Sequence, residues 1–323
     1  MTGNQITWQR GTVTASTRAA DGIARIVVRT EQRVRADPGS HVDVRIGPDA
    51  VRSYSIVETD GAGVTLGVRL SPTSRGGSAF MHALTPGAAI DITAPLQDFP
   101  LRIGAPRYVL LAGGIGITAI AGMAGALARL GADYTLVYVG RSRAGMAFLP
   151  ELTALHGDRL RPHIDDEGTG LDVAALVADA DPESELYMCG PIRLMDAVRR
   201  GWLAAQLPLP NLRYETFGNS GWFDTEEFTV RVPRLGIETS VRTGDSLLEA
   251  LERAGAEVMA DCRKGECGLC TVGIVDLRGA VDHRDVFFSD AQKARARQLC
   301  ACVSRVVRDR ADACPGVLTV DIP

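Results

Sequence analysis

Four cysteines in the last hundred residues have the spacing of a metal centre. Cys262, Cys267 and Cys270 follow one another as C-x4-C-x2-C within DCRKGECGLC, and Cys300 comes 29 residues after the third. This is the plant-type spacing for a 2Fe–2S cluster, in which four thiolates hold two irons. The sequence therefore predicts these four residues as iron ligands and a one-electron centre in this part of the chain.

The alternatives for the cysteines are a structural zinc site and a different fourth ligand. Zinc sites usually pair two short C-x2-C clips or add histidines, so the single clip here favours iron and sulfur. Cys302 follows Cys300 by two residues, and strand alternation would place both on one face. The spacing favours Cys300, and Cys314 is expected to have no role. Gly265 and Gly268 permit backbone angles that turn amide groups toward the sulfurs.

Two polar motifs in the first hundred residues could hold a phosphate beside an aromatic ring system. R-S-Y-S places an arginine, a tyrosine and two hydroxyls on a predicted strand, and R-G-G-S leads into a predicted serine-capped helix, Ser78–Leu84. Amide groups left free at a helix start suit a phosphate. Each motif alone is also explained by a polar strand face or an ordinary loop. The candidate residues are Arg52, Ser53, Tyr54, Ser55, Arg75, Gly76, Gly77 and Ser78.

Short alternating strands separated by turn residues surround these motifs. They are TWQRGTVTAS, IARIVVRT, HVDVRIG, VRSYSIVE, GVTLGVRL and AIDITAPL. Six such strands with one helical interruption predict an antiparallel barrel.

The middle of the chain has the pattern of a nucleotide-binding sheet. The apolar run YVLLAGG flows into Gly114-x-Gly116-x-x-Ala119 and a helical segment, and the strands YTLVYVG and ELYMCG come later. Strands alternating with helices predict a parallel sheet, and glycines between strand and helix let a pyrophosphate approach the backbone. After the second strand, where an acidic residue would accept from a ribose hydroxyl, the chain has Arg141, Ser142 and Arg143. These favour a 2′-phosphate, with a solvated basic turn as the alternative.

Cys189 ends the ELYMC strand, at the edge where open parallel sheets bind ligands. It would lie against a nicotinamide ring there. The alternative is that it only packs in the hydrophobic interior. Beyond GNSGWFDTEE, a plausible linker, the chain reads as a hairpin, a capped helix over Asp245–Ala254 and further strands, one of them at Leu299–Val303. We therefore expect domains at 1–104, 105–220 and 226–323. Arg263, Lys264 and Glu266 form the expected exposed lip of the cysteine loop, where an electron acceptor would dock.

Composition limits the class of partner. The 323 residues are 46% hydrophobic and 23% charged, with a net charge of −4 and both signs interspersed. Such a balance gives no long-range attraction to nucleic acid or to an anionic membrane. The sequence has no apolar run long enough to span a bilayer and no signal-peptide pattern at its start, so a cytoplasmic location is expected. An odd count of seven cysteines, four of them in a metal-like spacing, fits a reducing compartment.

Taken in this order, the motifs resemble the phthalate dioxygenase reductase family, the reductase components of two-component Rieske oxygenases, which includes vanillate demethylase reductases. The motifs are R-S-Y-S, R-G-G-S, G-G-I-G-I-T, Y-M-C-G-P, Y-E-T-F-G and the cysteine loop. Two positions depart from the family pattern: Gln97-Asp98 stands where an asparagine is frequent, and Ala119 replaces a proline. The resemblance implies an antiparallel β-barrel flavin domain, an α/β parallel-sheet nucleotide-binding domain and an α+β plant-type ferredoxin domain.

The resemblance also implies FMN, a 2Fe–2S cluster and NADH as cofactors, with NADPH as the alternative nucleotide. By motif position, Cys189, Ser55 and Phe217 would touch the reacting rings. The flavin would be held by Arg52, Tyr54, Ser55, Val68, Arg69, Gly76, Gly77 and Ser78, with Glu215 and Phe217 near it, and the nucleotide by Gly114, Gly116, Thr118 and Cys189.

The expected activity is transfer of electrons from NADH through FMN and the cluster to a terminal Rieske-type oxygenase or demethylase. A monomer is expected. Two alternatives remain: a reductase that serves a cytochrome P450, and a redox sensor that binds flavin and cluster without turnover.

Overall fold

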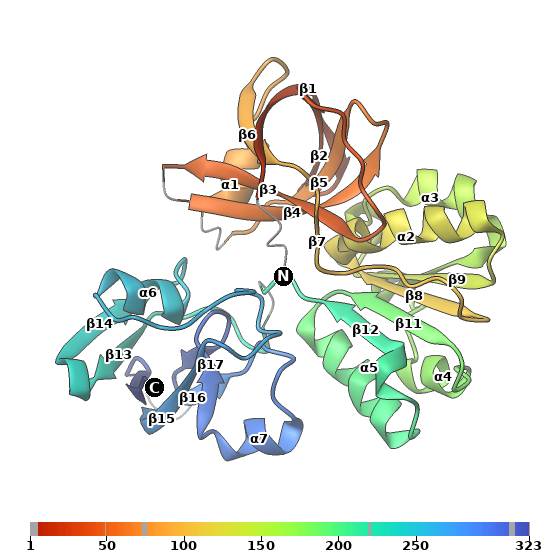
Figure 1. The fold of residues 1–323 in the computed structure, drawn as a ribbon. Helices are drawn as coiled ribbons and strands as arrows, with labels where there is room; N and C mark the ends of the chain where they lie inside the picture. Colours follow the sequence, from red (N-terminus) through yellow and green to blue (C-terminus); the bar gives the residue numbers. More distant parts are fainter. Residues whose placement is uncertain (1–5, 49, 73–75, 219–220, 310–313, 323) are drawn as a thin grey trace. The chain divides into compact units, whose positions relative to one another are not determined.

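The chain folds into two compact units in the computed structural model, which describes residues 6–48, 50–72, 76–218, 221–309 and 314–322. The first unit is Met1–Gly190 with Ala197–Glu215, and the second is Pro191–Asp196 with Thr216–Pro323 (Figure 1). The predicted flavin domain and most of the predicted nucleotide domain belong to the first unit, and the predicted cluster domain belongs to the second, together with Pro191–Asp196 and the residues from Thr216 on. The boundaries at 104, 220 and 226 stay predictions, and Arg75 lies outside the described residues.

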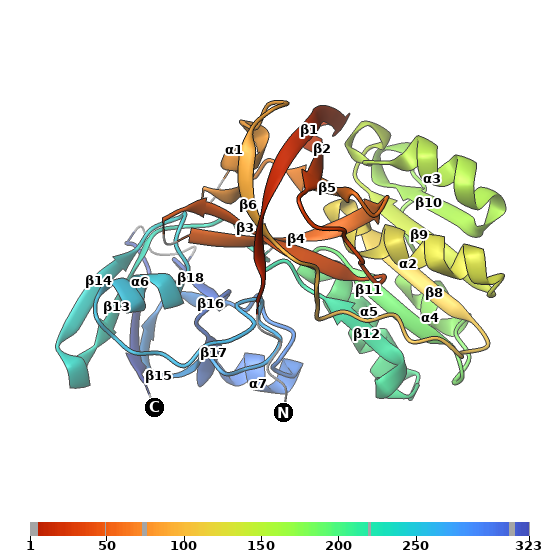
Figure 2. The ribbon, with the colours of Figure 1, turned by 45° about the horizontal axis from the view of Figure 1, so that its top comes forward.

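The N-terminal part of the first unit is an antiparallel barrel (Figures 1 and 2). Its sheet has the order β4-β5-β2-β1-β6-β3-β7, and pairing of β3 with β4 closes it. Alternate residues of the strands point inward, where Val13, Ile26, Val28, Leu66 and Ile92 are fully buried. The six predicted strands are confirmed as β1 (Trp8–Ala20), β2 (Ile23–Thr30), β3 (Ser40–Gly47), β4 (Ala50–Thr59), β5 (Gly63–Arg69) and β6 (Ala89–Thr93), with β7 (Leu96–Gln97) added.

Helix α1 (Gly77–His82) interrupts the barrel strands, as predicted, but its cap is different. Gly76 occupies the N-cap position with φ 86°, and no side chain caps the helix. The Ser78 hydroxyl accepts a hydrogen bond from the Ser71 amide at 3.1 Å instead. The prediction of a serine cap is therefore wrong. The positive φ at Gly76 starts the helix one residue earlier than the capping preference of serine suggests.

The second part of the first unit is a five-stranded parallel sheet of order β10-β9-β8-β11-β12. The strands are β8 (Tyr108–Gly113), β9 (Tyr134–Gly140), β10 (Leu160–Ile164), β11 (Glu185–Cys189) and β12 (Leu212–Glu215). Helices α2 (Ile117–Leu130) and α3 (Leu149–His156) cover one face, and α4 (Val173–Ala178) and α5 (Ile192–Ala204) the other (Figure 1). Because both faces are covered, β8 is buried along its whole length, as its apolar sequence predicts.

The second unit is a small mixed sheet with two short helices. Its five-stranded sheet, of order β14-β13-β19-β15-β17, consists of β13 (Phe228–Val232), β14 (Ile237–Val241), β15 (Thr271–Arg278), β17 (Gln298–Cys300) and β19 (Val317–Asp321). A two-stranded sheet joins β16 (Ala280–Asp282) and β18 (Arg305–Val307). The helices are α6 (Leu247–Arg253) and α7 (Asp290–Arg295).

The strand predicted over Leu299–Val303 is wrong in its second half. β17 ends at Cys300, and the amides of Val303 and Ser304 both donate to the Cys300 carbonyl, which closes a turn. Cys302 therefore lies in a turn and not on a strand face. Alternation no longer relates its side chain to that of Cys300.

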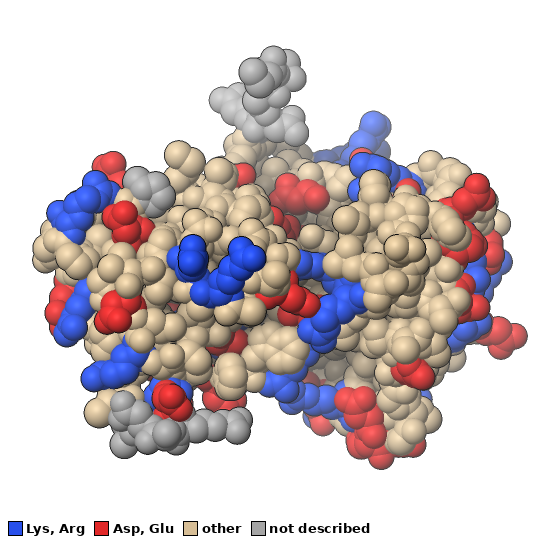
Figure 3. All heavy atoms as spheres, turned by 90° about the horizontal axis from the view of Figure 1, so that it is seen from below, with Lys and Arg blue, Asp and Glu red and all other residues tan. Residues whose placement is uncertain are grey.

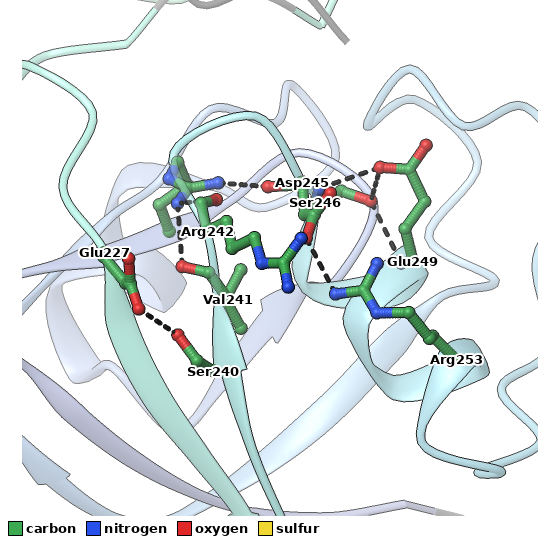
Figure 4. A network of polar contacts seen from close by, with 9 residues as sticks. Glu227, Ser240, Val241, Arg242, Asp245, Ser246, Glu249 and Arg253 are labelled. Carbon is green, nitrogen blue, oxygen red and sulfur yellow. Dashed lines mark hydrogen bonds and ion pairs between the residues drawn. The ribbon is translucent and has the colours of Figure 1, made fainter.

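Polar contacts, some exposed and some buried, hold the second unit around the hairpin β13–β14 and the start of α6. Ser246 and Glu249 form a capping box, Arg253 pairs with Asp245, and Ser240 donates to Glu227 (Figure 4). The Arg305 guanidinium donates to the carbonyls of Asp245, Glu226 and Arg242 and lies 5.3 Å from the centre of the Phe228 ring. This buried cation fixes the chain just beyond Cys302, since it satisfies carbonyls from several segments at once.

The described part of the predicted linker is held by the second unit. The Thr216 amide donates to Glu266 at 2.6 Å, and the Trp222 amide donates to Asp282 at 2.9 Å. Arg284, which also pairs with Asp282, donates to the Phe223 carbonyl at 3.2 Å. These residues therefore form part of a folded unit.

No helix among the described residues is long and apolar enough to cross a membrane. Figure 3 shows Lys and Arg side chains interspersed with Asp and Glu over the face that it presents, as the composition predicts.

Candidate functional site

The R-S-Y-S strand and the R-G-G-S segment meet in the barrel. A Cβ placed on Gly77 would lie 2.8 Å from Arg52 Cγ and 2.9 Å from the Tyr54 hydroxyl, so only glycine fits here. Arg52 and Tyr54 share one face of β4 because they are two residues apart. Burial raises the pKa of Tyr54 well above its ordinary value, so its hydroxyl keeps its proton and is available as a donor.

The two serines of the same motif behave differently from Arg52 and Tyr54. Ser53 is exposed, and its hydroxyl donates to Asp43 on β3 at 2.6 Å. Ser55 is buried and lies opposite His41 in the strand register. The structure thus brings Arg52, Tyr54 and Gly77 together and leaves Ser53 engaged elsewhere.

Two hydrogen bonds tie α1 to the end of β5. The Ser71 amide donates to Ser78 at the start of the helix, and His82 Nε2 lies 2.8 Å from the Val68 carbonyl at its end. Val68 is buried and Arg69 is exposed, both at the strand end where the resemblance places the flavin. His82 was not predicted as a site residue. It lies four residues after Ser78 and therefore on the same face of the helix, which is the pattern that could have indicated it.

The glycines of the nucleotide motif and Cys189 also converge. Gly114 has φ 54°, and a Cβ on Gly116 would lie 2.1 Å from the Cys189 carbonyl oxygen. Cys189 pairs in register with Ala112 on β8 and with Glu215 on β12, both buried. Gly114, Gly116 and Cys189, which were predicted to contact the nucleotide, thus lie together at the carboxyl edge of the sheet, and Glu215, which was predicted near the flavin, ends the neighbouring strand. The Thr118 hydroxyl donates to the Ile115 carbonyl at 3.0 Å and stabilises the turn.

The barrel and the parallel sheet touch directly beside this edge. A Cβ on Gly67 would lie 2.7 Å from Thr118 Cγ2 and 3.0 Å from Phe148 Cε2. The Asp21 amide, in the β1–β2 turn, donates to the Ala144 carbonyl at 2.8 Å. Phe148 has φ 61°, an uncommon value for an aromatic residue, and sequence reasoning missed it because nothing local signals it. The flavin and nucleotide candidates thus lie on two parts of one compact unit.

The arginines after β9 have separate surroundings. Arg143 forms two hydrogen bonds with Glu167, at 2.8 and 2.7 Å. Arg141 lies close enough to Arg69 for their mutual repulsion, after burial, to lower the pKa of Arg69. Ser142 starts a short turn, in which its carbonyl accepts from the Gly145 amide.

The cysteine loop brings its thiols toward one another. The amides of Lys264 and Cys267 lie 3.4 and 3.5 Å from Cys262 Sγ, and Cys270 Sγ lies 3.1 Å from Cys302 Sγ. Burial raises the pKa of Cys262, an effect that these amides oppose. Hydrogen bonds with the Cys300 and Cys302 thiols lower the pKa of Cys270 to about 3.

Cys300 and Cys302 differ in what else they contact. The Gly265 amide donates to Cys302, whose sulfur also lies near that of Cys262. Cys300 is fully buried. Its pKa is raised first by its hydrogen bond with Cys270, then by its burial and then by the negative charge of Asp285. Both thiols therefore contact Cys270, but Cys302 also contacts Gly265 and lies near Cys262 in the loop, whereas Cys300 faces the Asp285 carboxylate.

The glycines of the loop are required by the packing around them. Gly265 and Gly268 have φ 78° and 75°. A Cβ on Gly268 would lie 2.3 Å from Phe287 Cζ, and one on Gly265 would lie 2.6 Å from Val303 Cγ2. Together with the amides that face Cys262, this tight loop fits a 2Fe–2S cluster, since thiolate sulfurs that accept amide hydrogen bonds are stabilised. Among the described residues, no three potential ligands are arranged to hold a single metal ion.

The charged lip of this loop is less available than its sequence suggests. Arg263 pairs with Glu252 at 2.7 Å, and Glu266 accepts from the amide and the hydroxyl of Thr216. Phe217, which follows, is half-buried in the second unit. Arg263 is exposed although it is paired, and the apolar or thiol side chains exposed around the loop are Cys267, Leu269 and Phe287.

Comparison with known proteins agrees with this arrangement. Residues 230–307 match the 2Fe-2S iron-sulfur cluster binding domain. The chain is 37% identical over 273 residues to phenoxybenzoate dioxygenase subunit beta of Ectopseudomonas oleovorans, covering 83% of this chain and 84% of that protein. It is 36% identical over 280 residues to vanillate O-demethylase oxidoreductase of a Pseudomonas species, covering 83% and 87%.

The structure of phthalate dioxygenase reductase, described as modular for electron transfer from pyridine nucleotides to a 2Fe–2S centre, superposes with a TM-score of 0.71, at 28% identity and over 98% of both chains. The chain belongs to the phthalate dioxygenase reductase family. This membership confirms the predicted fold class and makes the chain an oxidoreductase of the flavin and iron–sulfur type. An intact type IV self-sufficient cytochrome P450 monooxygenase also matches, at 33% identity and a TM-score of 0.65, over 97% of this chain and 41% of that one.

Membership in the phthalate dioxygenase reductase family implies FMN, NADH and a 2Fe–2S cluster, and the residues present fit these groups. Gly77 lets the start of α1 approach Arg52 and Tyr54 closely, so a cation and a phenol hydroxyl stand beside the amides that would receive a phosphate. Gly114 and Gly116 keep the turn before α2 free of side chains, at a helix start where amides attract anions.

Proposed function

We propose that this chain is the NADH-dependent reductase component of a two-component oxygenase. A flavin held by the first unit would supply the conversion of a two-electron hydride into single electrons, and a cluster held by the cysteine loop would supply one-electron transfer to a terminal oxygenase or demethylase. The single observation that carries this proposal is the joint presence, in one chain of this family, of the Arg52–Tyr54–Gly77 group, the Gly114–Gly116–Cys189 edge and the cysteine loop.

The residues of the first unit act by binding and positioning. Arg52 and the amides after Gly76 would hold the flavin phosphate, and Tyr54, Ser55, Val68 and Arg69 would lie along its ring. Buried Cys189 and Glu215 would bound the nicotinamide position from the sheet side. Contact between Gly67 and Thr118 fixes the separation of the two binding surfaces, which matters because misplacement by about 1 Å costs on the order of 100-fold in rate. No side chain is required to act as a general acid or base.

We propose Cys262, Cys267, Cys270 and Cys302 as the cluster ligands, with Cys300 as the alternative that its spacing predicts. Support for Cys302 comes from the Gly265 amide that donates to it and from its closeness to both Cys262 and Cys270. Cys300 faces the Asp285 carboxylate, whose charge would oppose a thiolate there.

A protein partner would approach the exposed side of the cysteine loop. Cys267 is exposed, and Leu269 and Phe287 are each 46% exposed. Because one chain carries all three candidate sites, we propose that it works as a monomer; size-exclusion chromatography of the loaded protein tests this.

A cytochrome P450 is the second candidate acceptor, since the same modules occur over 97% of this chain within a P450 monooxygenase. The names of the relatives, a subunit of a dioxygenase and the oxidoreductase of an O-demethylase, favour an oxygenase as the acceptor. The deciding experiment gives the loaded protein NADH and either a Rieske oxygenase or a P450 and follows reduction of each acceptor. Selective reduction of the Rieske centre is expected, and selective reduction of the haem would overturn the assignment. If the loaded protein with NADH does not reduce even cytochrome c, the alternative of a redox sensor without turnover would be favoured.

A further inference from the structure

The segments that follow β9 and β10 leave the sheet side by side. Gly140 and Ile164 are register partners at the ends of these parallel strands. Arg141–Arg143 follows the first strand and Asp165–Glu167 follows the second. Three carboxylates therefore stand next to the two arginines, although 24 residues separate Arg143 from Glu167.

Arg143 is committed to Glu167. Its Nε donates to Oε1 at 2.8 Å, and one terminal nitrogen donates to Oε2 at 2.7 Å, which is the two-pronged geometry that favours arginine–carboxylate pairs. Glu167 raises the pKa of Arg143, and Arg143 in return lowers the pKa of Glu167. Both groups stay charged at neutral pH and neutralise one another.

The backbone holds both partners in place. The Met146 amide donates to the Arg143 carbonyl, and the Asp166 amide donates to the Arg141 carbonyl at 3.0 Å. In the segment after β10, the Gly168 amide donates to the Asp165 carbonyl and the Thr169 amide donates to the Ile164 carbonyl, each at 3.1 Å. Because each segment is fixed by hydrogen bonds, the pair is organised before any ligand arrives.

This edge is where a parallel sheet of this kind distinguishes the two nicotinamide cofactors. A carboxylate after the second strand accepts a hydrogen bond from the ribose 2′-hydroxyl, whereas a free arginine receives a 2′-phosphate. The sequence favours the phosphate, because its arginines follow β9 directly. In the structure Arg143 is paired with Glu167 and is not free. Asp165 and Asp166 add negative charge that would repel a phosphate dianion.

We propose that Glu167 sets the preference for NADH over NADPH by holding Arg143 in an ion pair, so that its guanidinium is not free to receive a 2′-phosphate. This rests on the proposed function, in that it assumes the nucleotide binds along the carboxyl edge of the sheet. Arg141 is outside the pair and next to Arg69, so its contribution is independent of Glu167.

The test replaces Glu167 with Gln and measures binding of two nucleotide fragments, ADP-ribose and 2′-phospho-ADP-ribose, by calorimetry. Wild-type protein should bind ADP-ribose more tightly. Glu167→Gln should bind the phosphorylated fragment about five-fold more tightly than wild type does, which is the scale of one exposed ion pair. The ratio of kcat/KM for NADPH over NADH should rise by a similar factor.

Two controls make the result specific. Asp158→Asn removes one negative charge at the opposite end of β10, in the exposed turn Gly157–Arg159, and should leave both affinities unchanged. The double variant Glu167→Gln/Arg143→Ala should lose the gain.

The proposal would be overturned if Glu167→Gln does not bind 2′-phospho-ADP-ribose more tightly than wild type. It would also be overturned if Asp158→Asn gains as much affinity, or if the double variant keeps the gain. A wild-type protein that binds neither fragment would instead contradict the proposed function.

Discussion

Gly67 on β5 lies directly against Thr118 at the start of α2, with room for no side chain between them. A Cβ on Gly67 would stand 2.7 Å from Thr118 Cγ2 and 3.0 Å from the Phe148 ring. Real Cβ contacts are essentially never shorter than 3.0 Å, so with any larger residue at this position the strand, Thr118 or the Phe148 ring must shift.

Gly67→Ala is therefore expected to slow reduction of bound flavin by NADH about ten-fold or more, since the two binding surfaces separate. The rate is compared per bound flavin, because Gly67 precedes Val68 and Arg69 on β5, which are themselves proposed to lie along the flavin ring. Stopped-flow absorbance measures the rate. Gly47→Ala is the matched control, as its Cβ would meet only Ala50 at 3.8 Å. Adding Thr118→Ser, which removes the opposing methyl group, should restore part of the rate; normal kinetics in Gly67→Ala would refute this interpretation.

The fourth cluster ligand can be decided by two single substitutions. Cys302→Ser should lose the cluster, because the proposed ligand that faces Cys262 and Cys270 is removed. Cys300→Ser should keep it, because serine fits the same buried space. Visible absorbance and acid-labile sulfide report cluster content. The opposite pattern would return the assignment to Cys300, and full cluster in both variants would show that either cysteine serves.

The buried pair Arg284–Asp282 is expected to stabilise the second unit. Arg284 Nε donates to Asp282 at 2.7 Å, both side chains are almost fully buried, and Arg284 also holds the Phe223 carbonyl. Arg284→Met leaves an uncompensated buried carboxylate and should lower the free energy of unfolding of this unit by about 3–5 kcal/mol. Urea unfolding followed by visible absorbance of the cluster measures it. Exposed Arg297→Met is the control, and equal midpoints for the two variants would contradict the prediction.

His156 should make stability depend on pH. Burial, followed by the charge of Arg159, lowers its pKa, and the Tyr134 hydroxyl lies 2.6 Å from its Nδ1. Its Nε2 is buried and has no hydrogen-bond partner among the described residues. A proton there would therefore be bound more weakly in the folded chain than in the unfolded one.

The sign follows from this difference. The stabilisation by neutral His156 is complete above the ordinary histidine pKa of about 6.5 and is lost as the pH falls from there toward the lower folded-state value. His156→Gln should flatten the dependence of Tm between pH 7.5 and 5.5. Scanning calorimetry of both proteins checks it, and parallel pH profiles would rule out this role for His156.

The sequence by itself determined the strands of the barrel, the parallel sheet and the cysteine loop. These features depend on local pattern: alternation along β1 to β6, the apolar run of β8, glycines at a strand end, and thiols spaced for two irons. The motifs that meet at Gly77 and at Gly116 also follow from the sequence, because strand order and helix direction leave few ways to place them.

Only the tertiary structure decided how these residues are used. Glu167 reaches Arg143 because two parallel strands end side by side, which reverses the charge expected from the arginines alone. Cys302 turns toward the loop because β17 ends at Cys300, where two amides bind one carbonyl. In each case the deciding contact joins residues whose distance depends on backbone pairing and packing. Residue types and their spacing along the chain do not determine that distance.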